Sequence, residues 1–176
     1  MKYGLKALII IALVALASGC TRINSSPGVP IVPNSRWGMA IFANNTEIPQ
    51  AGYRAMSITA GVLRSKGVRS LAIYPSTANC NKLIVCPNSV PPLSAVLSWA
   101  KARHLNYVMM GAVNEWDYKV GLDGEPTAGV SLQLYSVGNG ALVWSSVGSK
   151  IGTSRSGLAV IAQSLINEML SCLKIC

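Results

Sequence analysis

The chain of 176 residues gathers its few carboxylates around one stretch. It has six acidic residues, and two of them, Glu47 and Glu168, stand alone. Glu115 and Asp117 are two residues apart, and on a strand such residues face the same side with Cα atoms about 6.6 Å apart. Two carboxyl groups at about this separation serve glycoside hydrolysis. The four clustered acids, all between residues 111 and 148, are Glu115, Asp117, Asp123 and Glu125.

Other features of the sequence argue against catalysis. On a strand, Trp116 and Tyr118 would point away from Glu115 and Asp117, so no aromatic ring could stack a sugar beside the two acids. The single histidine, His104, closes a basic helix with no carboxylate within ten residues. No serine or cysteine therefore has a recognisable activating base. We expect no catalytic residue and no cofactor, with Glu115 and Asp117 as ordinary solvated strand charges.

The first segment is typical of a lipoprotein signal peptide. Lys2 and Lys6 precede an apolar run of about ten residues, which is too short to span a bilayer. Small residues follow, and then Cys20. We expect residues 1–19 to be removed and Cys20 to be lipidated, although Ala17 stands where leucine is usual. An aspartate after the cysteine would resemble a signal for retention in the inner membrane. Thr21 stands there instead and favours the outer membrane.

Removal of the two lysines lowers the formal net charge from +9 to +7. Nucleic acid is not the expected partner, because a secreted and anchored protein rarely meets any. Diffuse basic charge suits anionic lipid headgroups. A solvated basic surface without a specific partner explains it equally well.

Four cysteines remain beyond Cys20. We favour a disulfide between Cys80 and Cys86, worth roughly 2–3 kcal/mol for so short a loop. Cys172 and Cys176 could pair only if the last helical turn frays, and pairing between the two sets stays open. A metal site is not expected, because these cysteines lack C-x-x-C spacing and a nearby histidine.

Hydrophobic periodicity predicts a compact single α/β domain over residues 36–176, in which helices pack on a mixed sheet in the order β-α-β-α-β-β-β-α. Residues 20–35, rich in Ser, Pro and Asn, are expected to be a flexible tether. Val130, Leu132 and Leu134 alternate with polar residues and predict a half-buried strand. The predicted strands are 37–43, 71–74, 107–120, 130–135 and 141–147, and the predicted helices are 49–67, 93–104 and 154–173.

One block of residues carries a resemblance to a known family. It runs Glu115-Trp116-x-Tyr118-Lys119-x-Gly121-x-Asp123-Gly124-Glu125-Pro126-x-x-Gly129, followed by x-x-Leu132-x-Leu134 and then Leu142-x-Trp144-Ser145. The block closely resembles PelC, the outer-membrane lipoproteins of Pel exopolysaccharide secretion systems. The similarity extends over about residues 36–170, and the sequence around Cys20 agrees with it.

The resemblance implies a non-enzymatic role at the periplasmic face of the outer membrane. PelC-like proteins form a dodecameric ring beneath the porin PelB and guide the cationic Pel polysaccharide toward it. Glu115, Asp117, Asp123 and Glu125 would then face the polymer. Glycine and proline geometry alone is the other explanation of the Gly121–Pro126 turn.

The resemblance also implies an aromatic belt that seats the ring in the membrane. If Val143 and Val147 face the core, Trp144 is exposed and suits a membrane interface. The reverse phase would bury Trp144. We expect the exposed arrangement, with outer-membrane lipid as a partner. The rival hypotheses are a periplasmic carbohydrate-active enzyme using Glu115 and Asp117, and a monomeric lipoprotein that binds a partner.

Overall fold

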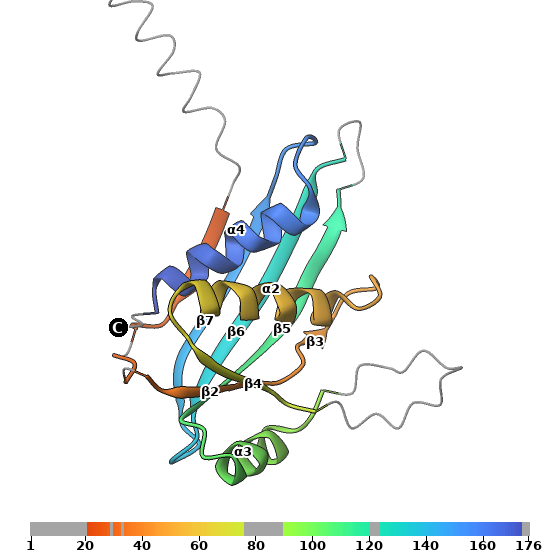
Figure 1. Ribbon diagram of the computed structural model, residues 1–176. Coiled ribbons are helices and arrows are strands. Elements are labelled where there is room, and N and C mark those ends of the chain that lie inside the picture. The colour runs from red at the N-terminus through yellow and green to blue at the C-terminus, as the bar shows by residue number, and fades with distance from the viewer. Residues whose placement is uncertain (1–20, 29, 33, 76–89, 120–123, 174–176) are drawn as a thin grey trace, which may run out of the picture.

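Seven strands form one mixed sheet, in the spatial order β1-β7-β6-β5-β2-β4, with β3 paired to β5 (Figure 1). The computed structural model describes residues 21–28, 30–32, 34–75, 90–119 and 124–173. The strands are β1 (Thr21–Ser25), β2 (Arg36–Met39), β3 (Ala43–Asn44), β4 (Ser70–Ile73), β5 (Tyr107–Tyr118), β6 (Pro126–Ser136) and β7 (Leu142–Ile151). The helices are α2 (Ala51–Ser65), α3 (Leu93–Ala102) and α4 (Leu158–Ser171).

The helices begin and end where the sequence signals a change of backbone. α3 follows directly on Pro92, whose extended backbone precedes the first turn. α2 ends before Gly67, whose φ of 102° is a backbone conformation that glycine adopts more easily than other residues. α4 begins at Leu158, four residues later than expected, because residues 153–156 form a turn closed by a hydrogen bond from the Ser156 amide to the Thr153 carbonyl.

The long strands β5, β6 and β7 are antiparallel neighbours and form the central part of the sheet. The turn between β6 and β7 contains Gly140 at a φ of 72°, a conformation that favours glycine. The Asn139 side chain accepts a hydrogen bond from the Ala141 amide at 3.1 Å. The predicted hairpin at residues 138–140 is confirmed.

A β-bulge in β5 decides which way its last side chains point. Val113 pairs with Val130, but the next pair is Glu115 with Gly129, so Asn114 is an extra residue. The Asn114 side chain accepts a hydrogen bond from Asn45 at 3.0 Å. A Cβ at Gly129 would lie 2.9 Å from the Cβ of Glu115, so only glycine fits opposite this residue. The bulge turns Trp116 and Tyr118 to the helix side of the sheet and Glu115 and Asp117 to the other side.

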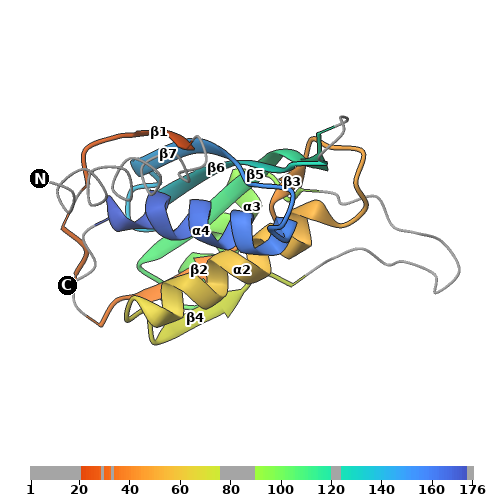
Figure 2. The ribbon, with the colours of Figure 1, turned by 90° about the horizontal axis from the view of Figure 1, so that it is seen from above.

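Helices α2 and α4 cover one face of the sheet, and the main core lies between them and the strands (Figures 1 and 2). Fully buried side chains from both layers fill it, including Trp37, Phe42, Leu63, Leu132, Leu165 and Met169. α3 packs against the lower end of the sheet in a second, smaller cluster formed by Ala40, Val96, Ala100, Leu105, Val108 and Val137. Among the described residues, no helix is long and apolar enough to cross a membrane.

The predicted α/β class and the order of elements from residue 36 onward are confirmed, with β3 as a short addition. The prediction of a flexible tether over residues 20–35 is wrong for its first part. Thr21 to Ser25 form the edge strand β1, which pairs antiparallel with β7. Ser25 and Ser146 also share a hydrogen bond between their hydroxyls at 2.6 Å. Pairing of the backbone orders this segment, although its sequence has only one apolar residue.

The prediction that Trp144 is exposed at a membrane interface is wrong. Its side chain is only 1 % exposed, and it lies in the main core on the same face of the sheet as its partner Leu134. The other face of β7 is the exposed one, and Val147 on that face has 48 % of its surface in solvent. The sequence allowed both phases because β7 has apolar residues on each face. Trp144 is therefore a core residue, and any membrane contact must use other side chains.

This burial predicts a loss of stability on truncation. Trp144→Ala should lower the free energy of unfolding by about 3–5 kcal/mol, because a large buried side chain leaves a cavity. Ile73→Ala is the matched control, since Ile73 is 43 % exposed and its truncation should cost less than about 1 kcal/mol. Chemical unfolding followed by circular dichroism measures both. Equal, small losses in the two variants would contradict the buried position of Trp144.

Candidate functional site

The described carboxylates of the acidic stretch lie at the tip of the β5–β6 hairpin. Glu115 accepts a hydrogen bond from the Lys119 ammonium at 2.5 Å, and this contact raises the pKa of Lys119. The Asp117 carboxylate accepts a hydrogen bond from the Tyr118 amide at 2.7 Å. Glu125 is exposed, and its carbonyl accepts a hydrogen bond from the Lys119 amide. Glu115 is therefore partly neutralised, whereas Asp117 and Glu125 have no ion-pair partner among the described residues.

Several predicted site residues lie outside the described part of the chain. These are Asp123, the lipidation candidate Cys20, and Cys80, Cys86 and Cys176. Cys172 is described, and it is exposed with a free thiol. Among the described residues, no group of three or more histidine, cysteine or acidic side chains could hold a metal ion.

An open cleft of about 670 Å³ lies on the other side of the hairpin, between α2, the end of β5 and the start of α4. Tyr53 and Arg54 line it from the first turn of α2, and Leu158 lines it from the first turn of α4. The Tyr118 hydroxyl accepts a hydrogen bond from the Leu158 amide at 3.3 Å and so joins the strand to the helix. The remaining lining residues are Ser57, Ile58, Trp116, Gly157 and Ala159. The walls are therefore aromatic, with one cation.

The cleft and the carboxylates lie on opposite faces of the sheet. No acidic side chain lines the cleft, and on β5 no aromatic side chain alternates onto the face of Glu115 and Asp117. A glycosidase needs two carboxyl groups in one concave site that holds the sugar. The geometry of the described residues therefore provides a charged hairpin tip and a separate apolar cleft, without a shared site for hydrolysis.

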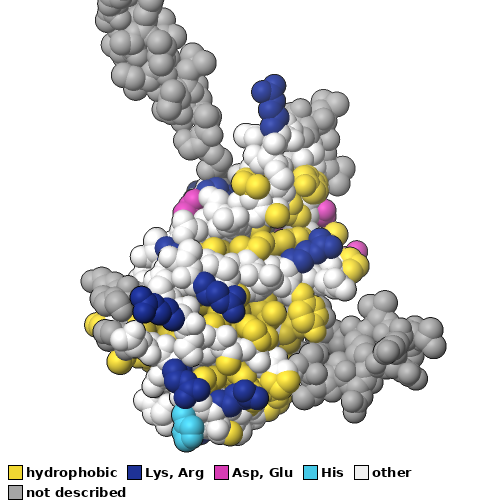
Figure 3. Space-filling model, viewed as in Figure 1, with side chains coloured by type: hydrophobic (Ala, Val, Ile, Leu, Met, Phe, Trp, Pro, Cys, Tyr) yellow, Lys and Arg dark blue, Asp and Glu magenta, His cyan; other side chains and the backbone are white. Residues whose placement is uncertain are grey.

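A group of exposed basic residues lies at the opposite end of the sheet, whereas the exposed Lys119 and Arg22 lie near the hairpin. At this end, Arg36 is the first residue of β2 and Asn106 directly precedes β5. The Arg36 amide donates a hydrogen bond to the Asn106 side chain at 2.7 Å. Figure 3 shows lysine and arginine side chains over this lower part of the molecule, around the single histidine. From this end to the acidic hairpin, the twelve residues of β5 extend roughly 35 Å. The exposed cations here include Arg36, Arg69, Lys101 and Arg103.

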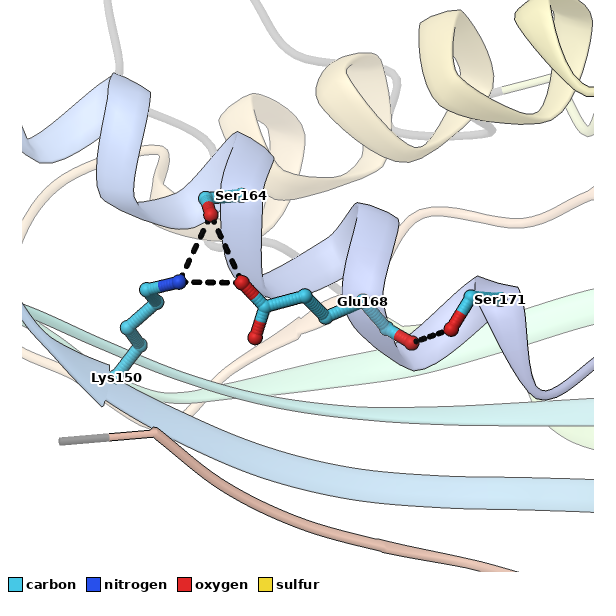
Figure 4. Close-up of polar contacts among 4 residues, drawn as sticks. All are labelled: Lys150, Ser164, Glu168 and Ser171. Carbon is cyan, nitrogen blue, oxygen red and sulfur yellow. Dashed lines mark hydrogen bonds and ion pairs between the residues drawn. The ribbon is translucent and has the colours of Figure 1, made fainter. Parts of the chain in front are cut away.

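A second polar cluster ties β7 to α4 (Figure 4). Lys150 forms an ion pair with Glu168 and donates a hydrogen bond to the Ser164 hydroxyl at 2.8 Å. The Ser164 hydroxyl in turn donates to the Glu168 carboxylate at 3.0 Å. Burial favours the neutral form of Glu168, but the hydrogen bonds from Lys150 and Ser164 and the charge of Lys150 outweigh it and lower the pKa of Glu168. The Thr21 hydroxyl contributes in the same direction and links β1 to the cluster.

This cluster predicts a pH dependence of stability. A carboxyl group whose pKa falls on folding stabilises the protein above its ordinary pKa, here 4.5, and this contribution is lost as the pH drops through the lower, folded value. Glu168→Gln should remove that contribution. Because the Glu168 side chain is 40 % exposed, the effect at pH 7 should stay below about 1 kcal/mol.

Urea unfolding of both proteins between pH 3 and pH 7 measures this difference. The gap between wild type and Glu168→Gln should be widest near neutral pH and should close toward pH 3. Glu47→Gln is the matched control, because Glu47 is exposed and makes no ion pair among the described residues. A gap that is independent of pH would contradict the role of Glu168.

Sequence reasoning found the acidic hairpin but missed the cleft and the Lys150–Glu168 pair. One signal was present in β5, where Trp116 and Tyr118 alternate with Glu115 and Asp117 and therefore share the opposite face. The other walls come from α2 and α4, about sixty residues before and forty after this strand. No local spacing connects Tyr53 or Leu158 to Tyr118.

No protein-family model matches the chain, and no curated protein sequence is similar to it. Solved structures do match. The chain is 37 % identical to a PelC dodecamer from Paraburkholderia phytofirmans crystallised in space group P6, with a TM-score of 0.76 over 89 % of this chain and 99 % of that one. A methionine variant of PelC from the same organism is a dodecamer in space group C2, and it matches at 36 % identity and a TM-score of 0.73 over 89 % and 100 % of the two chains. The chain therefore belongs to the PelC family.

Proposed function

We propose that this protein is a non-enzymatic outer-membrane lipoprotein that forms a homo-oligomeric ring and guides cationic Pel polysaccharide to the export porin PelB. The observation that carries the proposal is the 37 % identity over 99 % of a PelC protein that is a dodecamer. The ring would lie on the periplasmic face of the membrane, anchored by lipid on Cys20. A disulfide between Cys80 and Cys86 remains part of the proposal.

The charge distribution supports a local attraction for a polycation. A net charge of +7 repels a cationic polymer on average, so guidance needs segregated charges. Asp117 and Glu125 lie at one end of β5, close to the exposed Lys119 that pairs with Glu115, and a group of exposed cations lies at the other end. Repetition of the hairpin around a ring would line its opening with the carboxylates of Glu125 and Asp123. Each contact is weak and is screened within about 8 Å at physiological salt, which suits a polymer that must keep moving.

The register of β1 supports an orientation for the anchored ring. Thr21 pairs with Lys150, Lys150 with Ala128, and Ala128 with Trp116, so these four residues form one row across the sheet. A lipid on Cys20 would therefore lie at the same end of the domain as the acidic hairpin. In this arrangement the carboxylates line the opening next to the membrane, and the basic end faces the periplasm.

The acidic hairpin predicts a measurable affinity for polycations. Asp123→Asn and Glu125→Gln should each weaken binding of purified Pel polysaccharide about two- to fivefold at low salt, because an exposed charge contact is worth roughly 0.5–1 kcal/mol. Glu47→Gln, which removes a carboxylate outside the hairpin, should bind like wild type. Isothermal titration at two salt concentrations measures the effect, which should fade as the salt is raised.

Two outcomes would count against this function. Equal weakening by Glu47→Gln and Glu125→Gln would mean that only net charge matters and that the hairpin has no special role. Release of reducing ends from Pel by the wild-type protein, lost in Glu115→Gln or Asp117→Asn, would support the rival carbohydrate-active enzyme instead.

The lipid anchor has its own test. Cys20→Ser should move the protein from the outer-membrane fraction to the soluble periplasm, because the lipid on Cys20 is the proposed anchor. Mass spectrometry of the wild-type protein should find an acylated peptide that begins at Cys20. An unmodified Cys20 in a membrane-bound protein would contradict lipidation.

A further inference from the structure

On the side away from α2 and α4, α3 packs against the lower end of the sheet, and no other helix among the described residues covers β1, β7 and β6 on this side. Figure 2 shows α2 and α4 on one side of β1, β7, β6 and β5. The alternation of each strand assigns the outward residues: Val147 pairs with Asn24 on β1 and with Ser131 on β6, and Ser131 pairs with Ala112 on β5. The next row contains Ser145 and Gln133. We call this surface the open sheet face.

The composition of the open sheet face is typical of a protein interface. Its central rows contain hydroxyl, amide and small apolar side chains, with no charged residue, although the protein is strongly basic. Charged residues are depleted at the centres of protein interfaces. Val147 is 48 % exposed in the middle of this face, and Leu142 at its lower end is 49 % exposed. Exposed apolar residues on an uncharged surface suit contact with another protein.

A second apolar surface lies on the helix side. It is the open cleft between α2, β5 and α4, where Tyr118 is 47 % exposed. Val160, next to the lining residue Ala159, is 63 % exposed. Arg54 contributes a positive charge to the wall. This surface and the open sheet face lie on opposite sides of the domain.

We propose that the open sheet face of one copy packs against the helix-side cleft of the next copy, and that this head-to-tail contact builds the ring. The inference rests on the proposed function for the existence of a ring and adds the surfaces that form it. Head-to-tail contacts join two different surfaces and generate rings when the rotation closes. Two contact surfaces on opposite sides of one domain meet that need for a ring of many subunits.

One pair of charges on the two surfaces is complementary, although Arg22 also lies on the upper part of the open sheet face. Asp117 lies at the upper margin of the open sheet face, and Arg54 lines the cleft. Asp117 alternates along β5 with Trp116 and Tyr118, which line the cleft, so Asp117 and the cleft are at the same height along the strand. A closed ring has no translation along its axis. If the ring axis runs along the strands, neighbouring copies are not shifted along the strand direction. Asp117 of one copy would then lie at the same height as Arg54 of the next.

Two charge insertions test the proposal, each on one surface. Val147→Glu changes the open sheet face, and Val160→Glu changes the helix side. Val160 is the third residue of α4, whose first turn has no acidic residue, so a glutamate there should not weaken the helix. Native mass spectrometry of the full chain purified in detergent should find wild-type rings but monomers of each variant. Ile73→Glu, at the exposed β4 edge, is the control and should keep the ring.

Mixing the two variants gives the sharpest result. Val147→Glu keeps an intact cleft and Val160→Glu keeps an intact sheet face, so one native junction can form between them. The mixture should yield dimers that contain one of each variant and should not yield rings. Thermal melting of each variant within a few degrees of wild type would show that the domain is folded.

The outcomes separate this inference from the proposed function. Wild-type monomers at high concentration would overturn the ring itself. Wild-type rings that persist in both Val147→Glu and Val160→Glu would overturn only the choice of surfaces. Loss of rings in Ile73→Glu, with rings kept in Val147→Glu, would show that copies join through the β4 sheet edge. Homodimers of either single variant would contradict the head-to-tail arrangement.

Discussion

The bulge at Asn114 is the constraint on which the arrangement of this protein depends. Below it, Val113 faces the helices; without the extra residue, Glu115 would face them too and Trp116 would be in solvent. The bulge reverses this alternation, and Gly129 leaves room for Glu115 opposite. The result is one strand end with two different faces. One carries carboxylates, and the other places two aromatic rings in a cleft.

This separation places the described carboxylates and aromatic residues of one stretch on opposite sides of the sheet. Hydrolysis would need acids and sugar-binding rings on the same side. A ring-forming conduit can use them on opposite sides, because carboxylates can line an opening while apolar surfaces join neighbouring copies. The short Thr21–Ser25 strand adds a fixed link between the proposed lipid anchor and the end of the sheet that carries the hairpin.

Much of the fold follows from the sequence, and the errors have physical causes. Periodicity located α2, α3, α4 and the long strands because each buries a regular stripe. It failed for β1, an edge strand ordered by backbone pairing with little burial. It gave the wrong phase for Trp144 because Leu142 and Val147 are apolar on the other face of β7. The carboxylates of the candidate site were visible as a cluster, whereas the cleft joins residues that only the tertiary fold brings together.

An electron cryomicroscopy reconstruction of the full-length protein in lipid nanodiscs would test the central claim most directly. The account predicts a closed ring in which the β5–β6 hairpins surround the opening on the membrane side, with Glu125 of every copy facing the axis. Val147 of each copy should contact the cleft beside Val160 of its neighbour. A monomer, or a ring whose hairpins lie on the outer circumference, would contradict the account.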